Sequence, residues 1–218
     1  MDSARLRAGP SANVVVMIDR PAGAVKAALT PLMKRVTVRS VPSLAMVNLA
    51  NKSHAVTAEI EVPKSGAEGV IAAVGGVTGG WSLYAKDGKP KYCYNFFGLE
   101  LTYVEGKSVI PPGKHQVRME FAYDGGGIAK GGKVSLYVDG KKAGQGRIEQ
   151  TEPFAFGEES LDVGHEAGSP VTTDYGRNGG SEFSGQVNWV EFDADTAADD
   201  NNHLITPEER LRVAMAKQ

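Results

Sequence analysis

The chain has 218 residues, of which 41% are hydrophobic and 23% are charged, a composition typical of globular proteins with a sizeable core. Its net charge is -2 and its basic residues are spread along the chain, so it lacks the basic face that neutralises nucleic-acid phosphates. A single cysteine, Cys93, excludes an internal disulfide and a multi-cysteine zinc site. No signal-peptide pattern opens the sequence, and no apolar run approaches the ~20 residues of a membrane span. We therefore expect neither nucleic acid nor membrane as a partner and, by default, a cytoplasmic location.

Residues 1–47 follow no consistent pattern. The apolar run at residues 14–18 predicts a strand. The alanine-rich stretch that follows, which is interrupted by Pro21, Gly23 and Pro31, predicts a short helix. We treat these residues as a poorly defined N-terminal extension.

From residue 48 onward, apolar and polar residues alternate with the period of two that is typical of strands. The clearest runs are residues 56–62, 81–85, 92–96, 115–123, 134–138 and 186–192, and the last of these assigns Val190 and Phe192 to the core. Asp-Gly steps at residues 87–88 and 139–140 predict tight hairpins with positive φ at their centres. Residues 48–195 are therefore predicted to form an all-β domain, an antiparallel β-sandwich like a jelly roll.

Residues 196–218 are predicted to form an acidic linker and a C-terminal α-helix. The helix starts with the N-cap, first-turn proline and acidic residue of a capping box at residues 206–209. Leu211, Ala214 and Met215 share one face of this helix. That apolar face is the candidate for docking against another domain.

Five segments resemble the C-terminal region of bacterial arylsulfatases, which belong to the alkaline-phosphatase-like superfamily. They keep the order of that family, and they are residues 51–54, 79–100, 121–127, 139–142 and 203–216. The resemblance covers residues 48–218 and implies a module that follows, and packs against, a sulfatase catalytic domain. Apolar surface left exposed by the absence of that partner is also implied.

The chemistry of that family has no matching residues in this sequence. The resemblance implies a formylglycine made from Cys or Ser in a Cys/Ser-x-Pro-Ser-Arg motif, beside a divalent cation held by acidic residues. Residues 40–43 mimic the first four positions, but Leu44 replaces the arginine, and the surroundings of Cys93 match nothing in the motif. Asp193, Asp195 and Asp199 have spacing that hints at a calcium loop, but the glycine and glutamate of an EF-hand are missing. We expect no cofactor and no enzymatic activity in the isolated chain.

The run at residues 136–140 also resembles a hairpin of concanavalin-like and laminin-G-like jelly rolls, in which aromatic residues on a concave face often bind sugars. This resemblance implies carbohydrate as a possible partner, and the candidate stacking residues are Trp81, Tyr84, Tyr92 and Tyr94. Packing in the core or at its rim is the favoured alternative for these four side chains. The leading hypothesis is a non-catalytic module or remnant of an arylsulfatase, the second is a carbohydrate-binding module, and an enzyme of another class is the third.

Overall fold

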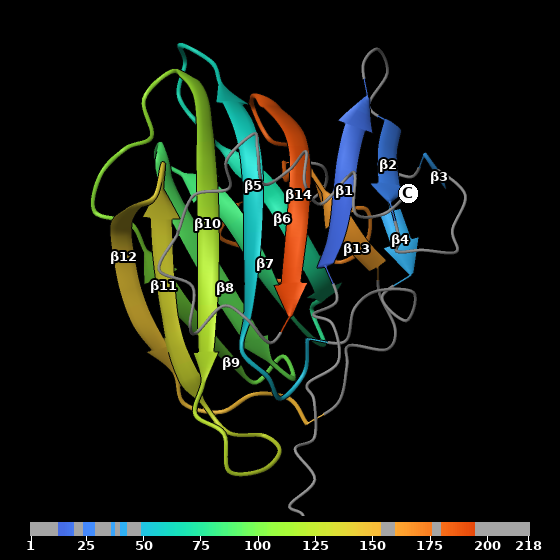
Figure 1. Cartoon of the computed structure of the whole chain (residues 1–218), viewed down its shortest axis with the longest axis vertical. Coiled ribbons are helices and arrows are strands. Elements are labelled where there is room, and N and C mark those ends of the chain that lie inside the picture. The colour runs from blue at the N-terminus through green and yellow to red at the C-terminus, as the bar shows by residue number, and fades with distance from the viewer. Residues whose placement is uncertain are drawn as a thin grey trace, which may run out of the picture.

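The computed structural model describes residues 13–19, 24–28, 36–37, 40–42, 49–153, 160–175 and 180–194. For residue 160 and the strands before residue 43, only the backbone is described. Within these ranges the chain forms fourteen strands and no helix. The strands form two antiparallel sheets that stack face to face (Figure 1). This arrangement confirms the predicted all-β sandwich.

Sheet A has eight strands, in the spatial order β12 (Lys141–Ile148), β11 (Gly132–Val138), β10 (Gly113–Tyr123), β5 (His54–Val62), β14 (Gln186–Ala194), β1 (Asn13–Asp19), β2 (Ala24–Ala28) and β3 (Val36–Thr37). Sheet B has six strands, in the order β4 (Ser40–Pro42), β13 (Ser160–Val163), β6 (Gly69–Gly76), β7 (Gly79–Lys86), β8 (Lys89–Phe96) and β9 (Glu100–Glu105). Because β12 lies near β9, the two sheets approach each other along one side.

The main core lies between the two sheets and contains the apolar side chains that the alternation places on their inner faces. Ile60 from sheet A and Leu83 from sheet B are both fully buried in it. Val190 and Phe192 also lie there with no exposed surface, which confirms their predicted assignment. Burying this much apolar surface is the main stabilising contribution to the sandwich.

Both predicted Asp-Gly hairpins are present. Asp87 and Gly88 have φ values of 51° and 75°, and Asp139 and Gly140 have values of 50° and 73°. Positive φ at both central residues is the mark of a type I′ turn, whose twist matches that of the flanking strands. The turns fix the registers of β7 with β8 and of β11 with β12.

The structure corrects the prediction for the N-terminal extension. The run at residues 14–18 is a strand as predicted, but the alanine-rich stretch forms β2 and pairs with β1, so the predicted helix is wrong. Strand β1 also pairs with β14, and β4 pairs with β13, so the described strands of this region extend both sheets. Pairing with a neighbouring strand outweighs the helix propensity of alanine, which is a weak local preference. The predicted linker and helix of residues 196–218 lie outside the described residues.

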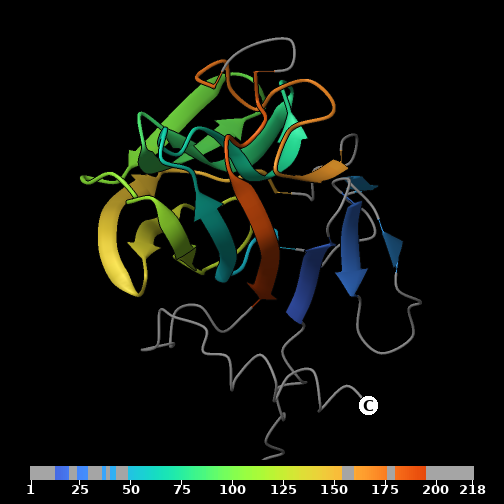
Figure 2. The same ribbon diagram turned by 90° about the horizontal axis from the view of Figure 1, so that it is seen from above.

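Two described stretches of the connection from β13 to β14, residues 164–175 and 180–185, cross the outer face of sheet B (Figure 2). We call these two stretches together the crossing segment. Its backbone is joined to the sheet because Val70 N donates to Ser181 O at 2.8 Å, and Gly164 N donates to Ile71 O at 3.0 Å. The part of the chain that the structure describes contains no helix that is long and apolar enough to span a membrane.

Candidate functional site

A small apolar cluster anchors the crossing segment to sheet B. Its members are all buried and come from β6, β7, β8 and the segment itself: Val70, Ala73, Tyr84, Cys93, Val171 and Tyr175. The rings of Tyr84 and Tyr175 meet edge to face, with their centroids 4.8 Å apart, which is a favourable geometry for two aromatic rings. The segment is therefore packed against the sheet and forms a defined wall over it.

Asp174 ties the same segment to the sheet through charged hydrogen bonds. Its Oδ2 accepts a hydrogen bond from Tyr84 Oη at 2.6 Å and another from Lys91 Nζ at 2.7 Å. Lys86 Nζ lies 3.3 Å from Asp174 Oδ1 and also donates to the Asp174 carbonyl oxygen. Burial opposes ionisation of Asp174, but the hydrogen bonds from Lys91 and Tyr84 outweigh it and hold the pKa of this carboxyl below its ordinary value. The carboxylate is therefore charged at neutral pH.

Asn95 joins three backbone segments beneath the crossing segment. Its Nδ2 donates to Gly76 O at 3.1 Å, to Val77 O at 3.2 Å and to Val171 O at 3.0 Å. Its Oδ1 accepts from Gly98 N at 2.7 Å. With 2% exposure, this side chain is buried and its polar atoms are paired, so it fixes the floor of the space described next.

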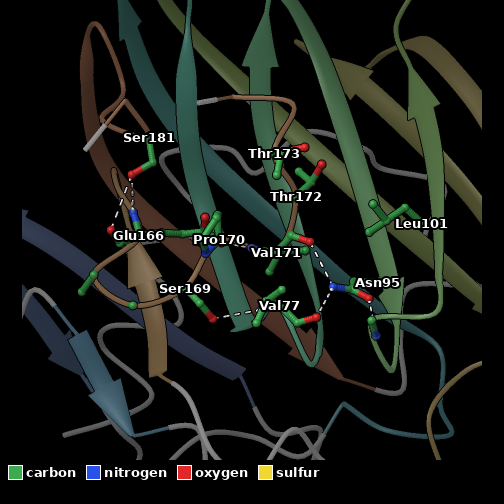
Figure 3. A pocket seen from close by; sticks show the side chains of 13 residues that line it. Val77, Asn95, Leu101, Glu166, Ser169, Pro170, Val171, Thr172, Thr173 and Ser181 are labelled. Atoms are coloured by element: carbon green, nitrogen blue, oxygen red, sulfur yellow. Dashed lines mark hydrogen bonds between the residues drawn. The ribbon is translucent and has the colours of Figure 1, made fainter. Parts of the chain in front are cut away.

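A groove of about 670 Å³ lies between the crossing segment and the end of the β8–β9 hairpin (Figure 3). Val77 and Leu101, which are 56% and 42% exposed, give it an apolar side. The opposite wall is short side chains and backbone, with hydroxyl groups from Ser169 and Thr173. The full lining is Val77, Asn95, Gly98, Leu101, Glu166, Ala167, Gly168, Ser169, Pro170, Val171, Thr172, Thr173 and Ser181.

An exposed aromatic ring adjoins the groove at Thr172. Tyr103 is 42% exposed, and its phenol oxygen lies 2.7 Å from Thr172 Oγ1. Lys91 Nζ lies 5.1 Å from the centroid of the ring. Tyr103 and Leu101 share the outer face of β9, because side chains alternate along a strand. Sequence reasoning missed Tyr103 because apolar or aromatic residues occupy both faces of this strand, which hides the exposed one.

The structure places the four predicted sugar-stacking residues in the interior. Trp81, Tyr92 and Tyr94 point into the main core, where Trp81 and Tyr92 stack with their centroids 6.2 Å apart. Tyr84 points to the outer face of sheet B but lies beneath the crossing segment. No side chain of this set is more than 7% exposed, so none presents a ring face to solvent, and the packing alternative fits their positions. The candidate docking residues Leu211, Ala214 and Met215 lie outside the described residues.

Several residues considered for sulfatase or metal chemistry can be placed. Residues 40–42 form the short strand β4, while Leu44 lies outside the described residues. Burial raises the pKa of the Cys93 thiol to about 12, so it is protonated at neutral pH and is a poor nucleophile. Asp193 lies in β14, whereas Asp195 and Asp199 fall outside the described residues. Among the residues that the structure describes, no three His, Cys, Asp or Glu side chains are grouped so that they could hold a metal ion.

No protein-family model and no curated protein matches this chain. A native heptameric SAP-like pentraxin from Limulus polyphemus is 14% identical, with 84% of this chain and 73% of that chain covered and a TM-score of 0.41. The Ruminococcus gnavus IT-sialidase CBM40 bound to α2,6-sialyllactose is 12% identical, with 75% of this chain and 84% of that chain covered and a TM-score of 0.45. Domains LG4-5 of the mouse laminin α1 chain are 16% identical, with 85% of this chain and 40% of that chain covered and a TM-score of 0.44. Likeness at this level assigns neither a family nor a ligand, and the resemblance to arylsulfatases gains no support from it.

Proposed function

We propose that the chain is a non-catalytic carbohydrate-binding module with a concanavalin-like jelly roll, and that its ligand lies in the groove beside the crossing segment. The observation that carries this proposal is the pairing of an exposed Tyr103 ring and Leu101 on one side with a wall of hydroxyl and backbone groups on the other. A sugar ring has an apolar C–H face and a rim of hydroxyl groups. It can therefore stack on the aromatic ring while hydrogen-bonding to the opposite wall.

The anchoring of the groove supports the same proposal. Asn95 and Asp174 hold the floor and the wall through buried or partly buried hydrogen bonds. A wall that is already fixed before a ligand arrives loses little conformational entropy on binding, which is the advantage of a preorganised site. The groove reaches the surface at Leu101, which is 42% exposed, so an oligosaccharide can extend past this residue.

A glycan array followed by isothermal titration of any hit tests the proposal. Tyr103→Ala should weaken binding of that glycan at least ~10-fold, since loss of a central aromatic contact typically costs more than about 1.4 kcal/mol. Val109→Ala, which shortens a side chain that is 61% exposed and lies outside the groove lining, is the matched control and should bind like the wild type. An array without hits, or equal binding by both variants, would overturn the proposal.

A second candidate follows from an exposed apolar patch at one end of sheet B. We infer from it that the chain packs against the catalytic domain of an arylsulfatase, as the resemblance in residues 48–218 implies. The patch consists of Val77, Phe97, Leu99 and Leu101, which are 56%, 46%, 83% and 42% exposed. We call it the end patch. Patches of clustered apolar side chains are typical of interaction sites rather than of ordinary surface.

The end patch gives this candidate its own test. Without the catalytic domain, the chain should self-associate in sedimentation velocity experiments, and Leu99→Asp should restore a monomer. Val109→Asp, at a comparably exposed apolar position away from the end patch, should leave the association unchanged. A wild-type monomer over a wide concentration range would count against the packing role. Hydrolysis of an aryl sulfate by the purified chain would contradict the non-catalytic reading that both candidates share.

A further inference from the structure

The outer face of sheet A is buried over part of its length, although no described strand or loop lies over it. Figure 1 views this face and shows no labelled element in front of β10, β5 or β14. Arg118, Thr57 and Glu191 stand side by side across these strands and point away from the core. They are only 2%, 1% and 8% exposed. On an open sheet face these side chains would be solvated, so something covers them.

The buried residues include charged and aromatic side chains, which indicates that the covering group packs directly on them. Arg118 Nε donates to Glu120 Oε1 at 2.7 Å, and the two side chains are only 3% and 10% exposed. Trp189 on β14 also points outward and is 1% exposed. Removing an ion pair and an indole ring from water together requires a covering group that packs directly on them.

Burial changes along the strands and so locates the cover. Toward the other end of the same face, Gln116 and Glu59 are partly exposed, and Lys114 and Glu61 are exposed. The buried part therefore lies near the end of sheet A where β14 finishes at Ala194. The buried positions form a band across β14, β5, β10 and also β11, where Tyr137 pairs with Arg118 and is 8% exposed.

We propose that residues 195–218 of this chain supply the cover. They follow directly from Ala194, at the end of the sheet where the buried band lies. Their predicted helix has an apolar face of Leu211, Ala214 and Met215, and their last nine residues carry three basic groups and no acidic side chain. Within residues 207–216 the charges of Glu208 and Glu209 offset those of Arg210 and Arg212, so the apolar face rather than net charge fits this segment to the sheet.

The dimensions fit this occupant. Four neighbouring strands at a spacing of about 4.8 Å span about 14 Å from the first to the last. A helix of ten residues is about 15 Å long, which is the span from residue 207 to residue 216. Residues 1–12, which also adjoin this end of the sheet, contain Met1 and Leu6 as their only large apolar side chains, so they offer less to pack on Trp189.

Acrylamide quenching of tryptophan fluorescence tests the proposal in the full chain. The chain has two tryptophans, and Trp81 in the core is 3% exposed, so quenching of the wild type should be weak. Ala214→Asp should raise the quenching constant severalfold by exposing Trp189, with near-ultraviolet circular dichroism confirming that the sandwich remains folded. Ala216→Asp makes the same substitution on the opposite face of the predicted helix and should leave quenching unchanged.

Other occupants give different results. If Leu6→Asp exposes Trp189 and Ala214→Asp does not, the N-terminal segment is the cover and the proposal is overturned. If dilution alone exposes Trp189, a second copy of the chain is the cover, which also overturns it. Should Ala214→Asp fail to fold, a protease site replacing residues 199–202 allows the folded chain to be cut. The released peptide should then co-elute with the sandwich in gel filtration, and its immediate separation with Trp189 still buried would contradict the proposal.

Discussion

The two faces of the β7–β8 ribbon are both buried, but they are buried in different ways. On the inner face, Trp81 and Tyr92 pack against the regular strands of sheet A. On the outer face, Tyr84 and Asn95 lie beneath the crossing segment, an irregular stretch that begins about 70 residues later in the sequence. The alternation of side chains along a strand therefore shows which residues share a face of the ribbon. It does not show which face is exposed to solvent.

The two faces also differ in the forces that hold their covers in place. Apolar contact dominates the inner face, where the cover is an extended sheet. The outer face adds a charged cluster on Asp174 and the three donations of Asn95 to backbone carbonyls. Because a small apolar cluster and these few polar groups hold the outer cover, changes there should loosen the crossing segment before they unfold the sandwich.

The largest expected effect comes from the inner face. Trp81→Ala removes a side chain that is 3% exposed and stacks on Tyr92, so it should lower the free energy of unfolding by about 3–5 kcal/mol. Chemical denaturation followed by circular dichroism measures the change. Leu99→Ala, at a position that is 83% exposed, is the control and should change stability by less than about 0.5 kcal/mol. Similar losses in both variants would contradict the assignment of Trp81 to the core.

On the outer face, Asn95→Ala should have the next largest effect. It leaves three carbonyl oxygens and the Gly98 N–H without their buried partner, which typically costs about 1–3 kcal/mol. The same variant should abolish glycan binding in the groove, because the floor and the wall at Val171 lose their connection. A variant with unchanged denaturation and unchanged hydrogen exchange near residue 171 would show that Asn95 does not join these segments.

Features that depend on residues close together in the sequence could be predicted, whereas features that depend on distant segments could not. The Asp-Gly turns and the core positions of Val190 and Phe192 follow from short-range chemistry, and the structure confirms them. Strand β2 was missed because only its pairing with β1 makes the alanine-rich stretch extended. The groove was missed because the crossing segment, which forms its wall, has no periodic pattern. Tyr103 lies on β9, the edge strand of sheet B, and its ring is 42% exposed. No local sequence pattern shows that this edge is less covered than β7 and β8.

The hydrogen bond from Tyr84 to Asp174 tests how strongly the outer cover depends on polar contacts. Tyr84→Phe keeps the packed ring but removes a donor to a charged acceptor at 2.6 Å, so stability should fall by about 1–2 kcal/mol. Hydrogen exchange should speed up in residues 165–175 while β10 and β5 stay protected. A double-mutant cycle with Asp174→Ala should give a coupling energy of at least about 0.5 kcal/mol. Additive effects of the two substitutions would mean that the bond does not anchor the segment.

The smallest effect is a pH dependence confined to the outer face. The pKa of Asp174 is lower in the folded chain than its ordinary value, mainly because hydrogen bonds from Lys91 and Tyr84 outweigh the effect of burial. The ionised carboxylate therefore contributes stability above the unfolded pKa of about 3.9, and this contribution is lost as the pH falls through the folded value. Partial exposure of the cluster and screening by solvent keep the change small.

Hydrogen exchange of residues 165–175, corrected for intrinsic rates, should thus be the same at pH 7 and pH 5 and faster below about pH 4. The inner strand positions around Trp81 should show no such step, since the side chains packed around Trp81 are apolar or aromatic. Asp174→Asn is the matched variant, because it keeps the shape of the side chain while removing its titration. If the acid step persists in that variant, protonation of Asp174 is not its cause and the carboxylate does not hold the crossing segment on sheet B.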